Sequence, residues 1–239
     1  MRPADELTIT AAQRAEFTRL MSGGRLSSYD AAVVTAAQAH VEVLDVYVYN
    51  MALASSYLGL VHLLEVCVRN AMHARLEKLA GKPNWWDALD LVDRQDEEVS
   101  QAVKRLKADK KRTGPVTPDD IVAALDFGFW TGLLKSGQEG ARPVNYDKTL
   151  WQPALQYAFP QFHAKRSDLE RRMNWARKLR NRISHHEPVH NLNHTQTYQS
   201  LVLLIQFTSD PIAKWAHDRS LHPYVVSRSP WSPKPMKHF

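Results

Sequence analysis

The chain has 239 residues, of which 44% are hydrophobic and 23% are charged, an ordinary balance for a globular protein. Lys and Arg outnumber Asp and Glu by 31 to 25, which gives a net charge of +6 and an isoelectric point of about 9.4. This excess suits a polyanionic partner, most often a nucleic acid, although a soluble basic protein without such a partner has the same charge. The single cysteine, Cys67, excludes an internal disulfide and favours a reducing cytosol.

The N-terminal segment MRPADELTITAAQRAEF is polar and lacks the apolar stretch of a signal peptide. The most apolar region, residues 41–68, carries three acids and a histidine: Glu42, Asp45, Glu65 and His62. It therefore predicts a buried helical region rather than a membrane span. We expect a soluble, cytoplasmic protein with no membrane partner.

Two short helices are expected at the start of the chain. The first covers residues 10–22 and is closed by Gly23 and Gly24 as a C-cap. The second starts shortly afterwards, where three residues favour a helix N-terminus: Ser27, Ser28 and Asp30.

Residues 30–80 contain no proline and only one glycine, Gly59, so the helical pattern continues throughout. The stretch is too long for one ordinary globular helix. Short polar residues gather at 50–56, and we expect a break there between two long packed helices. Gly81 and Pro83 end the second helix.

The rest of the chain is also predicted as helical. Thr117-Pro118-Asp119-Asp120 is a typical helix start, and the apolar run at 121–134 is expected in the core. Residues 135–150 are expected to form a loop, and residues 221–239 an irregular proline-rich tail. The other expected helices cover residues 94–111, 151–158, 166–186, 195–207 and 210–218. The prediction is an all-α fold with a single domain over residues 1–220.

The helix expected at 166–186 combines a core stripe with a basic surface. Its apolar residues recur three or four apart: Leu169, Met173, Ala176, Leu179 and Ile183. Asn181 and His185 share another face, about 40° apart, whereas Arg180 lies at the edge of the stripe. Two acids, Asp168 and Glu170, oppose eight basic residues: Lys165, Arg166, Arg171, Arg172, Arg177, Lys178, Arg180 and Arg182. This segment therefore has as large an excess of positive charge as the whole chain.

The end of this helix combines groups suited to acid–base chemistry. Pro188 disfavours helical geometry at Glu187, which predicts His185 and His186 in the last turn. RNA cleavage without a metal needs a base at the 2′-hydroxyl and an acid at the departing 5′-oxygen, and a histidine that titrates near neutrality can be either. Arginine matches phosphate and stabilises the charge that builds on it. A neighbouring asparagine can hold the histidine tautomer or contact the ribose.

No metal and no cofactor are expected at this site. His190 and His194 follow the pair at 185–186 closely, but no cluster of cysteines or carboxylates accompanies the four histidines. The simpler interpretation of the whole segment is a solvated basic face with a cation at the end of a helix.

The run Arg180-Asn181-Arg182-Ile183-Ser184-His185 fits the Arg-Asn-x-x-x-His form of the RNase motif of the HEPN superfamily. The continuation His186-Glu187-Pro188 resembles the Abi-like (abortive infection) branch of that superfamily. Three other stretches resemble the same branch in the same order: HLLEVCVRNAMHARL at 62–76, DFGFWTGLL at 126–134 and LWQPALQYAFP at 150–160. The resemblance covers about residues 28–220.

The resemblance implies a HEPN-type helical bundle that forms a homodimer, with the two motifs meeting at the interface. It implies metal-independent RNA cleavage that leaves a 2′,3′-cyclic phosphate, in phage defence or as a toxin. Such proteins are sometimes inhibited by a partner protein or by a structured RNA. Some relatives are catalytically inactive and only bind their partners. The alternative is therefore a non-catalytic RNA-binding or protein-interaction module on the same fold.

The expected catalytic residues are Arg180, Asn181 and His185. Arg180 and His185 are five residues apart, about 140° around an ideal helix, so they do not easily reach one phosphate from a single straight helix. A two-fold axis can bring His185 of one chain near Arg180 of the other. His186 fits a motif with one more spacer residue, and we favour His185 because it shares a face with Asn181.

A second polar island, EVCVRN at 65–70, interrupts an apolar helix. Glu65 and Arg69 are four residues apart, which by itself indicates an ion pair within the helix. The resemblance places this island against the segment 180–185. We therefore expect a set of residues to support the site or contact RNA: Glu65, Arg69, Asn70, Arg182 and His186. The residues expected to bind RNA along the basic helix are Arg171, Arg172, Arg177 and Lys178.

Overall fold

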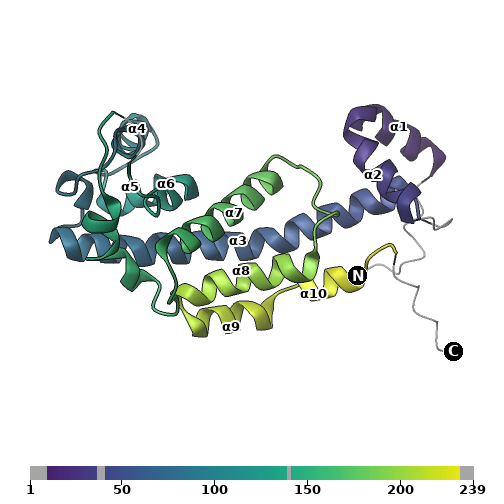
Figure 1. The fold of residues 1–239 in the computed structure, drawn as a ribbon. Coiled ribbons are helices and arrows are strands. Elements are labelled where there is room, and N and C mark those ends of the chain that lie inside the picture. The colour runs from purple at the N-terminus through teal and green to yellow at the C-terminus, as the bar shows by residue number, and fades with distance from the viewer. Residues whose placement is uncertain (1–9, 37–40, 139–140, 232–239) are drawn as a thin grey trace.

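The computed structural model describes residues 10–36, 41–138 and 141–231, and every regular element within these ranges is helical (Figure 1). The predicted all-α class is therefore confirmed. The helices in chain order are α1 (Ala11–Met21), α2 (Gly23–Ala36), α3 (Val43–Ala80), α4 (Asp93–Ala108), α5 (Pro118–Ala124), α6 (Phe127–Gly132), α7 (Arg166–Ser184), α8 (His194–Thr208), α9 (Asp210–Arg219) and α10 (His222–Ser227). Short helical turns lie at Trp85–Asp87, Asp147–Trp151 and Leu155–Ala158.

The helix α3 is the axis of the molecule and runs along most of its length (Figure 1). One side of it is fully buried, for example at Leu53, Tyr57, Leu64 and Met72, because α7, α8 and α10 pack along it. The helices α4–α6 lie at one end and α1–α2 at the other. By length and composition α3 would also pass as a membrane span, but core helices of globular proteins share these features.

The break expected at 50–56 is wrong, because α3 is continuous over 38 residues. Its short polar side chains bind other parts of the fold instead of ending the helix. The Oδ1 atom of buried Asn50 accepts hydrogen bonds from the backbone N–H groups of Val189 and His190 at 2.6 and 3.1 Å. The Ser56 hydroxyl lies 2.9 Å from Nδ1 of His222.

The N-terminal pair of helices exists, but its boundary differs from the prediction. Thr10 and Gln13 form a capping box at the start of α1. Gly23 and Gly24 do not close this helix; they open α2, because Ser22 makes the turn with a φ of 62°. The residues expected as caps therefore lie inside α2: Ser27, Ser28 and Asp30.

Several predicted boundaries are confirmed in the middle of the chain. Gly81 ends α3 in the left-handed region with a φ of 70°. Thr117 and Asp120 form the capping box that starts α5. The apolar run at 121–134 is mostly buried as expected, but Asp126 caps a separate helix, α6, by accepting a hydrogen bond from the N–H of Phe129 at 2.9 Å.

The C-terminal helices α7, α8 and α9 lie within two residues of their predicted bounds. The irregular tail expected from residue 221 is wrong over 222–227, which form α10 and pack against α3. Pro223 occupies the first turn of this helix, where its missing N–H costs nothing. Residues 232–239 of the expected tail lie outside the described ranges.

Candidate functional site

The helix α7 presents the motif on its solvent side. The predicted stripe is confirmed, since its five apolar residues are all buried: Leu169, Met173, Ala176, Leu179 and Ile183. The polar residues of the motif occupy the remaining surface. Asn181 is half-buried, whereas His185 is exposed.

A residue with a left-handed backbone conformation ends α7. The helix stops at Ser184, His185 is its C-cap, and His186 has a φ of 57°. The N–H of His186 donates to the carbonyl of Ile183 at 3.0 Å, and the N–H of Glu187 donates to the carbonyl of Arg182 at 2.9 Å. This pair of bonds is a Schellman motif, with a histidine where glycine is usual.

The prediction that His185 and His186 lie in the last helical turn is therefore wrong by one or two residues. The left-handed turn at His186 ends the helix before Pro188 can do so. Arg25 of α2 fixes the turn from outside, because its Nη2 donates to the carbonyl oxygen of His186 at 2.9 Å. No feature of the sequence pointed to Arg25, which is 161 residues away. Both imidazoles are left on the surface.

Arg180 is held by a carboxylate from α3. Its Nε donates to Oε1 of Glu65 at 2.9 Å, and its Nη1 donates to Oδ1 of Asn181 at 3.4 Å. The side chains of Arg180 and Glu65 are 36% and 25% exposed, so the pair sits at the surface rather than in the core. Because Glu65 occupies the Nε–H, the terminal Nη groups are the ones that can reach a phosphate oxygen.

The intrahelical ion pair considered for Glu65 and Arg69 is not formed. Glu65 binds Arg180 across the helix interface, and Nε of Arg69 instead donates to Oδ1 of Asn70 at 3.1 Å. The structure thus brings together the polar island of α3 and the motif of α7 through one contact between residues 115 positions apart.

The other predicted residues are spread along α7. Arg182 turns to the following loop, where its Nη2 donates to Oδ1 of Asn191 at 3.0 Å. Arg171 pairs with Asp168 at 2.7 Å, and Arg177 donates two hydrogen bonds to Asn174. Arg172 and Lys178 are exposed. These cations form a basic surface that extends away from His185 along the helix.

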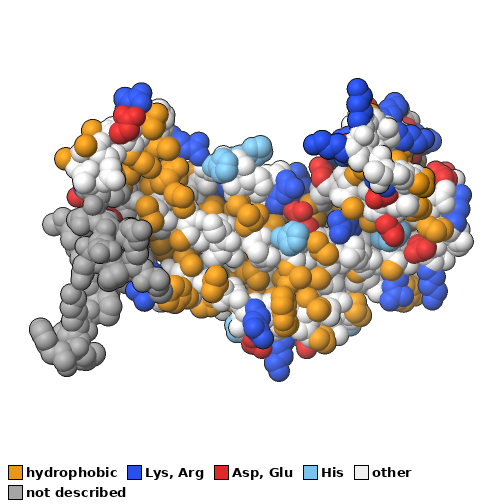
Figure 2. Space-filling view, turned by 180° about the vertical axis from the view of Figure 1, so that it is seen from behind, with side chains coloured by type: hydrophobic (Ala, Val, Ile, Leu, Met, Phe, Trp, Pro, Cys, Tyr) orange, Lys and Arg blue, Asp and Glu red, His pale blue; other side chains and the backbone are white. Residues whose placement is uncertain are grey.

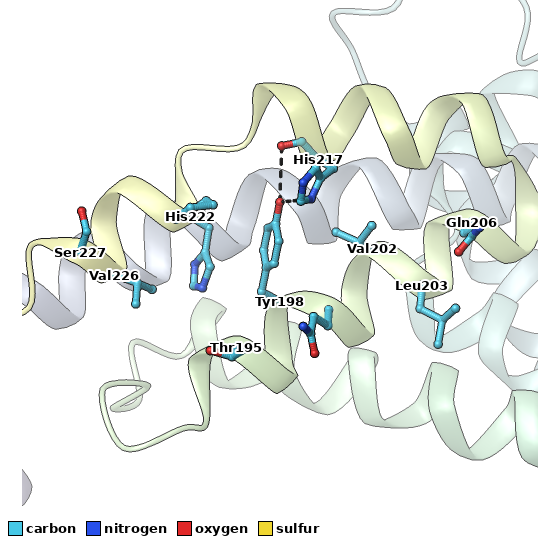
Figure 3. A pocket seen from close by; sticks show the side chains of 11 residues that line it. Thr195, Tyr198, Val202, Leu203, Gln206, His217, His222, Val226 and Ser227 are labelled. Carbon is cyan, nitrogen blue, oxygen red and sulfur yellow. Dashed lines mark hydrogen bonds between the residues drawn. The ribbon is translucent and has the colours of Figure 1, made fainter.

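Three other histidines are removed from the surface to different degrees: His190 and His222 are buried, and His194 is half-buried. Nδ1 of His194 lies 3.0 Å from the hydroxyl of Tyr57, and His222 stacks on Tyr198 with 5.0 Å between ring centroids. Figure 3 shows His222 and Tyr198 beside a cavity of about 690 Å³ between α8, α9 and α10, where the Tyr198 hydroxyl also lies 3.0 Å from Nδ1 of His217.

Burial changes the chemistry of the interior histidines. It lowers the pKa of His190 and of His194, and the positive charge of Arg182 lowers the pKa of His190 further. For His222, which is 2% exposed, burial lowers the pKa to about 4. Burial therefore favours the neutral form of all three side chains, although His190 and His194 are close in sequence to the exposed pair.

Within the described ranges, no three His, Cys, Asp or Glu side chains are grouped as metal ligands would be. What the site offers chemically is an anchored guanidinium, an amide and two exposed imidazoles. Compared with protein-family models, with curated proteins and with solved structures, the chain gives no significant match.

Proposed function

We propose that this protein is a metal-independent endoribonuclease that acts as an abortive-infection or toxin effector. The observation that supports this most is the contact of Glu65 with Arg180, which fixes a guanidinium at the surface one turn before two exposed imidazoles. The likeness of the segment 180–188 to the RNase motif of the HEPN superfamily, and to its Abi-like branch, supports the biological role.

The proposed reaction assigns one step to each group. His185 takes the proton from a ribose 2′-hydroxyl, and the resulting oxygen attacks the neighbouring phosphorus. The Nη groups of Arg180 stabilise the negative charge on the phosphate oxygens, and Asn181 orients Arg180 or the ribose. The bond to the 5′-oxygen then breaks as that oxygen takes a proton from solvent at this exposed helix end, and the proton on His185 returns to solvent. The products are a 2′,3′-cyclic phosphate and a 5′-hydroxyl.

A second copy of the chain would complete this site. Glu65 turns Arg180 towards α3, whereas His185 lies beyond the last turn of α7, so the two groups leave the helix in different directions. In a two-fold dimer, Arg180 of one protomer can face His185 of its partner, and each dimer then contains two equivalent sites.

The exposed face of α3 offers a surface for that second copy. Val48, Met51 and Leu58 are 57%, 55% and 48% exposed, and with Ser55 and His62 they follow a spacing of three and four residues. This heptad spacing is typical of helices that pack against another helix. The next position of the same stripe is Glu65, so a partner seated on it would lie beside Arg180. Figure 2 shows hydrophobic side chains gathered on this side of the molecule, with histidines on the same face.

The sharpest test mixes two inactive variants. Arg180→Ala and His185→Ala are expected to be inactive alone. In a mixed dimer with sites shared between protomers, one site has lost both groups, but the other keeps Arg180 from one chain and His185 from the other. Co-expression of the two variants with different affinity tags, followed by purification of the mixed dimer, should therefore restore about half of the wild-type cleavage rate per dimer.

Two outcomes would contradict the proposal. An inactive mixed dimer, with wild-type dimers active, would place Arg180 and His185 of one chain in the same site. A stable, fully active monomer in light scattering would remove the shared site altogether. If the wild type binds RNA without cutting it, the chain is an RNA-binding module instead.

A further inference from the structure

A groove runs between α7 and α8. Its volume of about 510 Å³ lies in the range of ordinary ligand sites. From α7 it is lined by Arg171, Arg172 and Trp175, and from α8 mainly by Gln196, Ser200 and Leu204. The groove therefore combines cations, an indole, hydrogen-bonding side chains and an apolar floor.

Trp175 is unusual among the residues of this basic helix. It is 37% exposed, so part of the indole remains open to solvent and is not buried in the core. A partly exposed tryptophan flanked by arginines can stack on a nucleobase, because every base offers a π-face. The same ring can also accept a guanidinium or a ligand cation on its face.

The charge of the groove fits the backbone of the same ligand. Arg171 and Arg172 are exposed, and Arg171 is partly ordered by Asp168 at 2.7 Å. Among the described side chains that line the groove, none is acidic. Gln196 and Ser200 add an amide and a hydroxyl, which are the groups that read the edges of unstacked bases.

The position of the groove relates it to the proposed catalytic end. Trp175 and His185 are ten residues apart on one helix and its cap, or about 15 Å along the axis. We propose that the groove binds a base of single-stranded RNA a few nucleotides from the bond that is cut, with Trp175 as the stacking platform and Arg172 as a phosphate contact. This inference rests on RNA as the ligand of the proposed function, but not on cleavage.

The test measures binding separately from cleavage. The probe is a short fluorescent oligouridine with 2′-O-methyl riboses, which lacks the attacking hydroxyl and cannot be cut. Trp175→Ala should weaken its binding roughly 5- to 100-fold, whereas Trp175→Phe, which keeps a ring, should stay much closer to wild type. Trp215→Ala is the matched control, because Trp215 of α9 is 56% exposed and does not line the groove; its affinity should not change.

Salt dependence separates stacking from charge. Trp175→Ala removes no cation, so the slope of affinity against salt should match the wild type, while Arg172→Ala should reduce that slope by about 0.7. A general loss of folding would not produce this split, and melting curves of each variant at the same pH provide the check.

The possible results are distinguishable. Loss of oligouridine binding in Trp175→Ala alone supports the groove, even if the wild type proves unable to cleave RNA. If Trp175→Ala binds oligouridine with wild-type affinity and still cleaves RNA, the groove is not the base-binding site, and the proposed function is unaffected. A wild type that binds no oligouridine overturns it as well, and a Trp175→Ala variant that loses only a protein partner assigns the groove to protein binding.

Discussion

The protein has two regions rich in histidine, and they differ in almost every physical respect. At the end of α7, His185 and His186 are exposed beside the anchored Arg180. In α8 and α10, half-buried His194 lies beside the Tyr57 hydroxyl and buried His222 stacks on Tyr198, and burial lowers the pKa of both. Only the exposed pair can exchange protons with a large substrate, whereas the interior ones are polar parts of the core.

This contrast shows that histidines close together in the sequence can have different chemical roles. His186 and His190 are four residues apart, yet the second lies under Tyr29 with 4.8 Å between ring centroids. Asn50 pulls the backbone at 189–190 into the core by accepting two hydrogen bonds there. Each experiment below changes one side of this comparison.

The largest effect is expected at His185. His185→Ala removes the proposed base but leaves the positive surface intact, so cleavage should fall about 100-fold or more while RNA binding is retained. A cleavage assay and a gel-shift titration on the same RNA would measure the two quantities.

The matched control for this change is His186→Gly. Glycine adopts the left-handed conformation of residue 186 without strain, so this variant removes an imidazole without disturbing the turn, and stability should rise by up to about 1 kcal/mol. Cleavage should stay close to wild type. If His186→Gly is inactive and His185→Ala is active, His186 is the catalytic histidine.

The stability of the fold should fall in acid because of buried His222. The pKa of His222 lies below that of a free histidine, so the unfolded chain binds a proton that the folded chain does not, between about pH 6.5 and pH 4. Stability is therefore present above this window and is lost as the pH falls through it. Acidification from about pH 7.5 to about pH 5 should cost about 2 kcal/mol from this group.

His222→Phe is the variant that isolates this contribution. It keeps a ring between Tyr57 and Tyr198, loses the contact with Ser56, and cannot take up a proton. Urea unfolding at both pH values should show less acid destabilisation than in the wild type. An unchanged difference between the two pH values would show that His222 does not titrate in this way.

A smaller effect is expected from the carboxylate that orients Arg180. Glu65→Ala removes the acceptor of the 2.9 Å bond, so Arg180 loses its fixed direction and cleavage should fall about 10-fold. RNA binding should not weaken, because a negative charge has been removed from the surface. Glu65→Gln keeps an acceptor and should lose less activity. Parallel loss of binding and cleavage would make Glu65 a purely structural residue.

The smallest effect is expected far from the helix end. Arg171→Ala should weaken RNA binding a few-fold and reduce its salt slope by about 0.7, because one phosphate contact is lost. Arg19→Ala is the control, since Arg19 is also exposed and paired with an acid three residues away, but lies on α1. Equal effects of the two variants would show that only the net charge matters.

Local signals in the sequence predicted most of the fold. The spacing of Leu169, Met173 and Ala176 predicted the buried face of α7, and the capping pair Thr117 and Asp120 predicted the start of α5, because both depend on neighbours in the chain. The continuity of α3 could not be predicted in this way. Asn50 is of a residue type that is unfavourable inside a helix. Its side chain is tolerated within α3 because it accepts hydrogen bonds from backbone groups 139 and 140 residues away.

The same distinction holds at the candidate site. The residue types of the motif were visible in the sequence, and the family resemblance predicted that the polar island at 65–70 lies against the segment 180–185. The choice of Glu65 depends on how α7 packs against α3, and the left-handed turn at His186 depends on the Schellman bonds and on Arg25 of a distant helix. The interior position of His190 and His194 likewise follows from tertiary packing.

The central claim is RNA cleavage by side chains alone, and one digestion tests it most directly. Purified wild type and His185→Ala would be incubated with total RNA in the presence and absence of EDTA, and the new ends identified. The expected result is equal cleavage by the wild type in both conditions, with 2′,3′-cyclic phosphate ends, and none by His185→Ala. Loss of cleavage on chelation that a divalent ion restores, or full activity of His185→Ala, would contradict the account.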